Sequence, residues 1–516
     1  MAAADLRIGI DVGGTNTDAV VLDGADRLLA SAKRPTSADV TGGIAAAVRA
    51  VLDQIEAPGA VRRVMLGTTH ATNAVVERRR LNRVAVLRAG APATLALPPL
   101  VTWPADLRAA VSVGETVVGG GAEVDGRPLA ALDRDAAARF LTEVGATAEA
   151  IAITSVFSPV SPDDELALRD LAHELLGPIP VSLGHEVGTL GLLERENATV
   201  LNAALTTVAG EIVAGLQEVL RELALDVEVY LAQNDGTLMA LAHAERFPVL
   251  TIGSGPANSL RGAALLSGVE DAIVCDVGGT TTDIGFLVGG FPRESSLPVE
   301  IGGIRTNFRM PDVLAIGVGG GTIVRTGEHG VEVGPQSVGF AIGTQALVFG
   351  GEVATLTDAA VAAGRMTIDG QPIPAAWLPR LASALALADA RIADAVDRMK
   401  TARAAQPLIA VGGGAPLVPS TIAGISEIIR PRNADVANAI GAAIALASGR
   451  ADEVLPASGD RRGLVDGVCE RACARAVAAG ADSARVAIID VVEVPLAYLD
   501  PPAVRVTARA AGPLHP

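Results

Sequence analysis

Cysteine is scarce in this sequence, which contains only three in 516 residues. Cys275 lies within an apolar run, whereas Cys469 and Cys473 stand four residues apart in a predicted helix. No disulfide framework can be drawn from these positions, so a reducing compartment is expected. The helical pair offers two metal ligands, but no further Cys or His stands nearby to complete a zinc site, and structural thiols are the commoner interpretation.

Lysine is almost absent, since Lys33 and Lys400 are the only two, and the formal net charge is −17. Binding to a phosphate backbone depends on clustered Lys and Arg, so nucleic acid is not expected as a partner. The sequence also has no run of about 18 uninterrupted apolar residues and no basic N-terminal segment leading into a long apolar core. Neither export nor a membrane is therefore expected, and the predicted location is the cytoplasm.

Several catalytic motifs are missing. Neither lysine follows a glycine, which excludes a P-loop, and the run GVGGGT at 317–322 does not complete Gly-x-Gly-x-x-Gly. No serine has glycines two residues before and after it, and neither His173 nor His185 belongs to a His-Glu-x-x-His motif. A self-contained serine or zinc hydrolase is therefore not expected.

An internal repeat is the most informative feature that is present. Residues 8–22 read IGIDVGGTNTDAVVL and residues 273–287 read IVCDVGGTTTDIGFL. Between Asp11–Asp18 and Asp276–Asp283, seven of eight residues are identical. Each copy places a Gly-rich turn between two apolar runs, which predicts a β-hairpin in each of two similar lobes.

The residue types at these turns favour phosphate binding. Glycines let the backbone approach a ligand closely, so that turn amides can point at phosphate oxygens, and short hydroxyl side chains add donors. The alternative is that Gly-Gly-Thr only makes a tight turn, and the second matching copy argues against it. The predicted phosphate-binding residues are Gly13, Gly14, Thr15, Asn16, Thr17, Gly278, Gly279, Thr280, Thr281 and Thr282.

An aspartate stands immediately before each turn. Asp11 and Asp276 would be repelled by bare phosphate, but a hydrated Mg²⁺ between carboxylate and phosphate makes them favourable. We therefore predict Asp11 and Asp276 as metal-facing residues.

The paired turns resemble the phosphate motifs of the actin, sugar-kinase and Hsp70 superfamily. The third element of that superfamily, a Gly-rich adenosine loop, is matched at residues 408–425, where Gly412, Gly413 and Gly414 follow an apolar run. Residues 433–445 resemble its small-residue helix that crosses between the lobes, and a counterpart is expected within 194–225. The alternative for both segments is an Ala-rich packing helix.

A more specific resemblance is to the hydantoinase/oxoprolinase family, in its nucleotide-binding subunit. The motifs that carry it appear in order at 67–79, 194–205, 233–239, 253–263, 311–323, 331–339 and 355–366. The segment FAIGTQALVFGG at 340–351 departs from the pattern of longer members, and the chain is shorter than they are at its C-terminus. His70 replaces a usually aliphatic residue, so it is either a subfamily-specific contact or an ordinary loop histidine.

This resemblance implies an ATP- and Mg²⁺-dependent enzyme that phosphorylates a cyclic amide, such as a hydantoin or 5-oxoproline, for ring opening. It implies a second hydrolase subunit as partner and catalytic roles for Asp11, Asp18, Asp276 and Asp283. The alternatives are a small-molecule kinase and a non-catalytic, ATP-gated partner subunit. The sequence leaves homo-oligomerisation undetermined. Substrate contacts are expected from Thr68, Thr69, His70, Asn73, Asp312, Gly319 and Gly320.

The predicted fold is α/β, with two actin-like (ribonuclease H-like) lobes of mixed sheets and a small C-terminal α/β appendage. A chain of this length exceeds one core, since single cores stop growing at about 250–300 residues. The first lobe is expected over residues 1–190 and the second over 191–450, with the appendage over 451–516. Within the appendage we expect a helix at 463–479 and strands at 486–494 and 503–508, without an assigned function.

Overall fold

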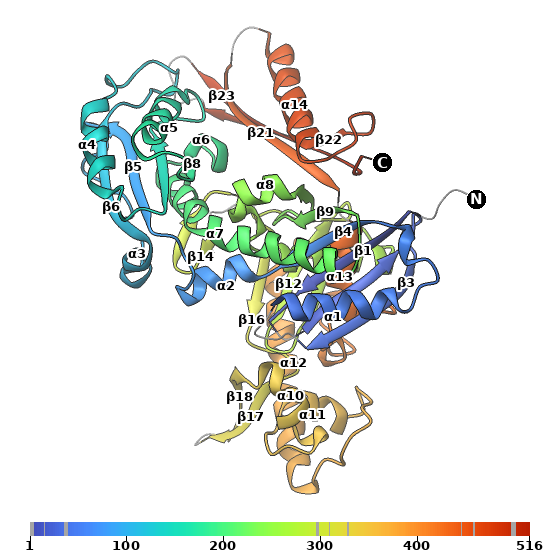
Figure 1. The fold of residues 1–516 in the computed structure, drawn as a ribbon. Coiled ribbons are helices and arrows are strands. Elements are labelled where there is room, and N and C mark those ends of the chain that lie inside the picture. The colour runs from blue at the N-terminus through green and yellow to red at the C-terminus, as the bar shows by residue number, and fades with distance from the viewer. Residues whose placement is uncertain are drawn as a thin grey trace.

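The computed structural model describes residues 5–14, 16–35, 40–295, 299–308, 310–327, 330–444, 446–457, 460–496 and 502–515. Two mixed sheets of nine and six strands lie at the centre of the molecule, and smaller units project from them (Figure 1). The predicted α/β class with mixed sheets is confirmed.

The nine-stranded sheet begins with the first predicted hairpin, which is confirmed. Strand β1 (Leu6–Val12) pairs antiparallel with β2 (Asn16–Leu22) and parallel with β4 (Val61–Thr68). Helices α1 (Val40–Leu52) and α7 (Leu192–Glu222) pack on one face through apolar side chains. The other strands are β3 (Leu28–Pro35), β9 (Glu228–Ala232), β10 (Leu238–Ala240), β21 (Ala447–Pro456), β22 (Ala487–Leu496) and β23 (Ala503–Gly512).

The six-stranded sheet repeats this arrangement around the second hairpin, which is also confirmed. Strand β11 (Ala272–Val277) pairs antiparallel with β12 (Thr282–Val288) and parallel with β19 (Gln406–Val411). Helix α12 (Leu378–Met399) and helix α11 (Leu356–Ala362) belong to the core on one face. The remaining strands are β13 (Phe291–Pro292), β16 (Val313–Ile316) and β20 (Ile425–Ile429).

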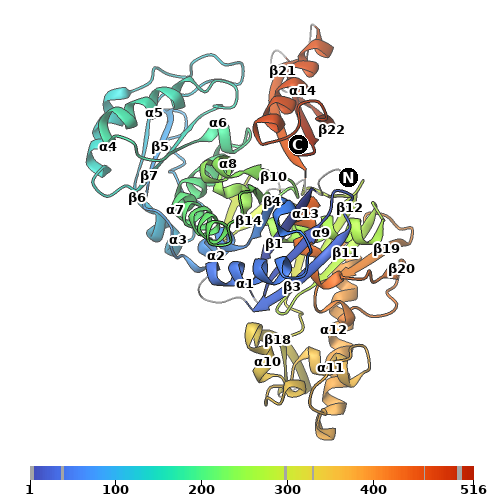
Figure 2. The same ribbon diagram turned by 45° about the vertical axis from the view of Figure 1, so that its right-hand side comes forward.

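Two helices pack against each other between the central sheets (Figure 2). Helix α13 (Ala437–Ile444) lies on β1, β2 and β4, and helix α9 (Ser254–Ser267) lies on β11, β12 and β19. The sequence places the counterpart of α13 within 194–225. A helix does form there, but the helix that packs against α13 is α9, because glycines on these two helices allow their backbones to meet.

A parallel four-stranded sheet forms a separate unit beside α7 (Figure 1). Its order is β6-β5-β7-β8, and helices α4 and α5 pack on it. The N-terminal half of α7 packs against this unit and its C-terminal half against the nine-stranded sheet, so α7 joins the two. The bounds are α2 His70–Glu77, β5 Val84–Ala91, α3 Ala105–Val111, β6 Ser112–Gly119, α4 Arg134–Val144, β7 Ala150–Ser155, α5 Asp163–Leu176, β8 Val181–Leu183 and α6 Gly184–Val187.

The C-terminal residues extend the nine-stranded sheet. Helix α14 (Arg461–Ala478) packs on β21 and β23 through small side chains, and the helix and two strands expected after residue 460 are present. Strand β21 runs across residue 450, so residues from all three predicted segments share one sheet. The division of the chain at residues 190 and 450 stays a prediction.

Smaller elements complete the part of the chain that the structure describes. Strands β17 and β18 form a hairpin beside α10 to α12, in the unit that protrudes at the bottom of Figure 1. The bounds of the smaller strands and helices are α8 Leu241–Arg246, β14 Val299–Ile301, β15 Ile304–Thr306, β17 Thr322–Gly327, β18 Gly330–Ser337 and α10 Ile342–Gln345.

One helix, α7, is long and apolar enough to cross a membrane by length and composition. Of its most apolar window, 61% is buried inside the structure, against the two sheets that it joins. Core helices of this kind meet the same criterion.

Candidate functional site: a cleft between the two Gly-rich turns

Both Gly-rich turns open into one cavity of about 430 Å³. The turns have the same internal geometry, because Gly13 N–H donates to the carbonyl oxygen of Asn16 at 3.0 Å and Gly278 N–H donates to that of Thr281 at 2.9 Å. The sequence repeat is therefore a structural repeat whose two copies lie at the same cleft.

Four aspartates from the hairpins line this cavity. Asp11 on β1 lies directly opposite Asp18 on β2, and Asp276 on β11 lies directly opposite Asp283 on β12. Like charges directly opposite each other destabilise an antiparallel pair. Two such pairs facing one cavity are therefore more consistent with ligand binding than with stability.

Burial and mutual repulsion raise the pKa values of these carboxyls. Burial, followed by the charge of Asp18, raises the pKa of Asp11 to about 7. Burial, followed by the charge of Asp276, raises the pKa of Asp283 to about 7. Burial also raises the pKa of Asp18 and of Asp276. The free protein therefore holds these groups poised to take up a cation or a proton.

Helices α9 and α13 provide hydrogen bonds to two of the aspartates. Ser259 on α9 donates through Oγ to Asp276 Oδ2 at 2.6 Å, and Asn438 on α13 donates through Nδ2 to Asp11 Oδ2 at 3.4 Å. Each helix that packs between the central sheets thus holds one carboxylate.

The triple glycine lies against the second turn. A Cβ on Gly412 would lie 2.3 Å from Asp276 Oδ1, and one on Gly414 would lie 2.6 Å from a methyl carbon of Val277. Gly413 has open space at its Cβ position and lines the cavity, as Gly14 does in the first turn. The outer two glycines are therefore explained by packing on β11, and Gly413 leaves room for a ligand.

The comparisons with known proteins agree with this arrangement. A model described as hydantoinase/oxoprolinase N-terminal region matches residues 7–176, and one described as hydantoinase/oxoprolinase matches residues 195–370. The chain belongs to the hydantoinase/oxoprolinase family.

Relatives of this hydantoinase/oxoprolinase chain include the caprolactamase subunit alpha of Pseudomonas jessenii, 28% identical over 395 residues that cover 70% of this chain and 55% of the relative. The acetophenone carboxylase gamma subunit of Aromatoleum aromaticum is 27% identical over 401 residues, which cover 70% of this chain and 53% of the relative. The chain spans about half the length of these curated relatives. The crystal structure of ATP-dependent caprolactamase from P. jessenii shares its fold, with a TM-score of 0.79 at 21% identity over 99% of this chain and 88% of that one.

Most of the residues predicted for nucleotide binding in this family member lie at the cavity. Thr17 and Thr282 are buried and do not line it, and Thr282 Oγ1 donates to the carbonyl oxygen of Val318 at 2.6 Å. Thr15 lies outside the described residues. Those that line the cavity are Gly13, Gly14, Asn16, Gly278, Gly279, Thr280, Thr281, Gly412, Gly413 and Gly414.

Among the residues predicted to contact substrate, Thr69 and Gly320 line the cavity. Gly320 N–H donates to the carbonyl oxygen of Gly278 at 3.0 Å, and a Cβ on Gly319 would lie 2.6 Å from Thr280, so these glycines support the second turn. Asp312 forms an ion pair with Arg293 at 2.6 Å and does not line the cavity.

His70 lies next to the cleft without lining it. Its Nδ1 lies 2.5 Å from Thr68 Oγ1, and burial lowers the pKa of His70. Asn73 is exposed and donates through Nδ2 to Thr69 Oγ1 at 3.4 Å. The neutral form of His70 is therefore favoured.

Lys33 is a site residue that the sequence did not reveal. It lies on β3 directly opposite Asp18, and its Nζ donates to Asp18 Oδ2 at 2.7 Å and to the carbonyl oxygen of Asp435 at 3.0 Å. The alternation of β3 predicts the face on which Lys33 lies, but no motif marks it. Lys33 brings a positive charge to a cavity that is otherwise lined by five carboxyls, those of the four hairpin aspartates and of Asp435.

The donor set fits a divalent cation. Asp11 Oδ1 and Asp18 Oδ1 are buried without a hydrogen-bond partner, a state that is costly for a charged group. Carboxylate oxygens are ligands that Mg²⁺ prefers, and Mg²⁺ keeps several waters when one or two carboxylates hold it. Among the described residues no cluster of three or more His, Cys, Asp or Glu forms a closed metal site.

Proposed function

We propose that this chain uses ATP and Mg²⁺ to phosphorylate the carbonyl oxygen of a cyclic amide, such as a hydantoin, 5-oxoproline or a related lactam, for ring opening. The proposal rests on one observation above all. Both Gly-rich turns, the triple glycine and two opposed pairs of aspartates converge on one cavity.

Amide resonance makes a lactam carbonyl a poor electrophile. Phosphorylating its oxygen gives an activated imidate that water can attack. Protonation of the ring nitrogen and cleavage of the ring C–N bond then give an acyl phosphate, and its hydrolysis releases the carboxylate and phosphate. Catalysis of phosphoryl transfer relies on positioning and on stabilising charge on the transferring oxygens. Amides of the turns at Gly13–Gly14 and Gly278–Gly279 would hold the phosphates, and Lys33 would add a positive charge.

Asp11 and Asp276 would hold Mg²⁺, which supplies charge neutralisation at the phosphates when it is bound. Asn438 and Ser259 keep one oxygen of each carboxylate in place. Asp18 and Asp283 would orient the reacting groups, and Gly413 would leave space for the nucleoside. Thr69 would contact the substrate, since it lines the cavity beside the first turn.

A second subunit would complete ring opening. The caprolactamase, acetophenone carboxylase and acetone carboxylase relatives are all described as subunits, and this chain spans about half the length of the first two. We therefore propose a partner that carries out hydrolysis of the activated amide.

Calorimetric titration with ATP and Mg²⁺ tests the nucleotide site. We expect wild-type binding in the micromolar range and loss of about tenfold or more in Asp11→Asn and Asp276→Asn, because each variant removes a charged ligand. Asp271→Asn is a matched control, since Asp271 lies just before β11 and does not line the cavity. Equal affinity in all four proteins would contradict the proposed roles.

Turnover then tests the substrate class. ATP consumption should rise when 5-oxoproline, hydantoin or caprolactam is added, and should rise further with the partner present. The acetophenone carboxylase relative favours a second candidate, in which a ketone is the phosphorylated carbonyl compound. Stimulation by acetophenone with bicarbonate, but not by any lactam, would support that candidate instead.

A further inference from the structure

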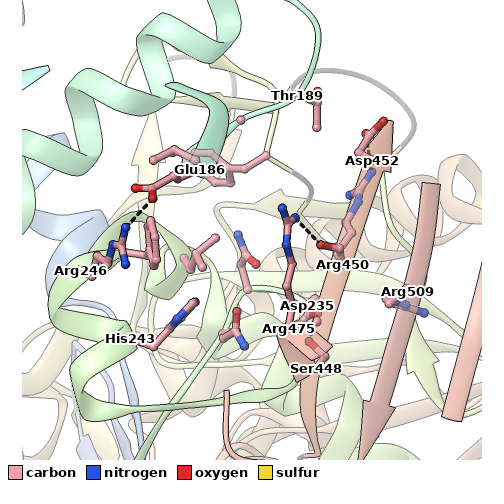
Figure 3. A pocket seen from close by; sticks show the side chains of 18 of the residues that line it. Glu186, Thr189, Asp235, His243, Arg246, Ser448, Arg450, Asp452, Arg475 and Arg509 are labelled. Atoms are coloured by element: carbon pink, nitrogen blue, oxygen red, sulfur yellow. Dashed lines mark hydrogen bonds and ion pairs between the residues drawn. The ribbon is translucent and has the colours of Figure 1, made fainter. Parts of the chain in front are cut away.

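A second cavity of about 430 Å³ lies away from the nucleotide cleft. Its walls come from α6 and the loop after it, the β9–β10 turn, α8 and the C-terminal elements β21, β23 and α14 (Figure 3). Residues after 450, to which the sequence assigned no function, therefore form one side of this cavity. Its volume greatly exceeds that of one water, which occupies about 30 Å³ in the liquid.

Most of the charged groups in this cavity are already paired. Glu186 pairs with Arg246, Glu294 pairs with Arg509 at 2.8 Å, and Asp452 pairs with Arg505 at 2.6 Å. These pairs need no ligand to neutralise them.

Arg475 is different. It is an exposed residue of α14 whose Nη1 donates to the carbonyl oxygen of Arg450 at 2.6 Å, and no carboxylate of the described chain lies within ion-pair distance of it. Figure 3 shows its guanidinium group inside the cavity, beside β21. A guanidinium has five N–H donors, so Arg475 keeps donors for a ligand.

Asn234 provides a second, independent observation. Its side chain lines the cavity and is only 4% exposed, yet its Nδ2 has no hydrogen-bond partner. Leaving such a buried donor unpaired costs free energy, and an acceptor on a ligand would remove that cost. Leu250 and Phe308, which also line the cavity, add an apolar surface.

We propose that this cavity binds a small carboxylate with an apolar body, its carboxylate held by Arg475 and Asn234 and its body against Leu250 and Phe308. A carboxylate supplies acceptors for Asn234 Nδ2 and for the N–H groups of Arg475 that do not bond the Arg450 carbonyl, and Arg binds it with charge-assisted hydrogen bonds. The site is separate from the nucleotide cleft, since none of these four residues lines that cleft.

Titration of the nucleotide-free protein with hexanoate, followed by calorimetry, tests the proposal. Hexanamide has the same body without the charge and should bind about tenfold more weakly or worse. Hydrogen exchange should show that hexanoate protects peptides containing Asn234 and Arg475 and leaves those of the two phosphate turns unchanged. Because no nucleotide is added, the result is independent of the proposed ATP site.

Two variants and one control make the test specific. Arg475→Gln should weaken hexanoate binding by about tenfold or more. Asn234→Leu should weaken it about threefold or more without lowering the thermal midpoint, because an unsatisfied buried amide is replaced by an apolar group of similar size. Arg471→Gln changes an arginine one turn earlier on α14 that pairs with Glu453 outside the cavity, and it should bind hexanoate as the wild type does.

Three results would overturn the proposal. One is the absence of hexanoate binding by the wild type, and another is equal binding of hexanoate and hexanamide. The third is wild-type affinity in both Arg475→Gln and Asn234→Leu. Loss of binding in Arg471→Gln would also count against it, since that result would indicate a general effect of charge on α14.

Discussion

Gly262 on α9 lies in backbone contact with Ala437 on α13, so that a Cβ at Gly262 would lie 1.9 Å from the carbonyl oxygen of Ala437. A Cβ at Gly441 on α13 would lie 1.8 Å from the carbonyl oxygen of Asn258 on α9 in the same way. These two contacts bring the two central sheets together, and the same helices carry Ser259 and Asn438 to the aspartates of the cleft.

Gly262→Ala should destabilise the protein, because backbone atoms of α13 would have to move to admit one methyl group. Inserting a methylene into a packed interior costs about 1–3 kcal/mol, and a clash with backbone belongs at the upper end. Urea unfolding measures the change. Gly210→Ala is the control, since Gly210 lies in α7 with nothing within 4 Å of its Cβ position, and it should gain about 0.5–1 kcal/mol. Equal stability in the two variants would contradict the contact.

Gly412→Ala should abolish nucleotide binding, whereas Gly413→Ala should leave the fold of the protein intact. Gly412 has φ of +85°, and its Cβ would lie 2.3 Å from Asp276 Oδ1 and 2.4 Å from the carbonyl oxygen of Val277. The strained backbone alone costs about 1–2 kcal/mol, and relieving the clash would displace Asp276. At Gly413 a Cβ meets open space, so Gly413→Ala tests only the room left for a ligand. Thermal midpoints with and without ATP and Mg²⁺ separate the two effects.

Arg88 and Glu196 form a fully buried ion pair between β5 and α7, with two hydrogen bonds of 2.6 Å. Arg88→Met should destabilise the protein by about 3–5 kcal/mol, because it leaves the Glu196 carboxylate buried and unpaired. Combining it with Glu196→Met should restore much of that loss, since no charge is then buried alone. The exposed pair Arg169–Asp170 is the control, and Arg169→Gln should cost less than about 1 kcal/mol. If the double variant were as unstable as Arg88→Met, packing would be the cause instead.

His243 should make stability depend on pH. Burial, with Arg246 as the second cause, lowers the pKa of His243 in the folded protein. The unfolded chain then binds the proton more readily, so the stability from neutral His243 is present above its usual pKa of about 6.5 and is lost as pH falls below it. His243→Gln should therefore lose less stability than the wild type between about pH 7.5 and 5.5. The raised pKa of Asp283 acts in the opposite direction in both proteins, so the difference between them isolates His243. Identical pH profiles of the unfolding midpoint would refute this prediction.

The sequence alone determined the elements whose cause is local. Apolar runs on either side of Gly-Gly-Thr specify each hairpin, and the spacing from Asp11 to Asp18 places these residues opposite each other once the turn forms. The same holds for Asp276 and Asp283. Chain-wide motifs also identified the family, because they occur in order over most of the chain.

Only the tertiary structure decided which distant residues meet. Lys33, Ser259 and Asn438 reach the aspartates because β3, α9 and α13 pack there. Ser259 and Asn438 lie in recognised motifs, but those motifs do not reveal which side chain meets a carboxylate. Strand β21 contains charged residues and Pro456 and spans the boundary predicted at residue 450, yet pairing with β23 makes it part of the central sheet. The cavity at Arg475 and Asn234 likewise exists only once α14 packs over β21. Periodicity and turn chemistry act over a few residues, whereas these contacts join different elements and depend on packing that no single segment encodes. The hydrogen bond from Asn438 to Asp11 spans 427 residues of sequence.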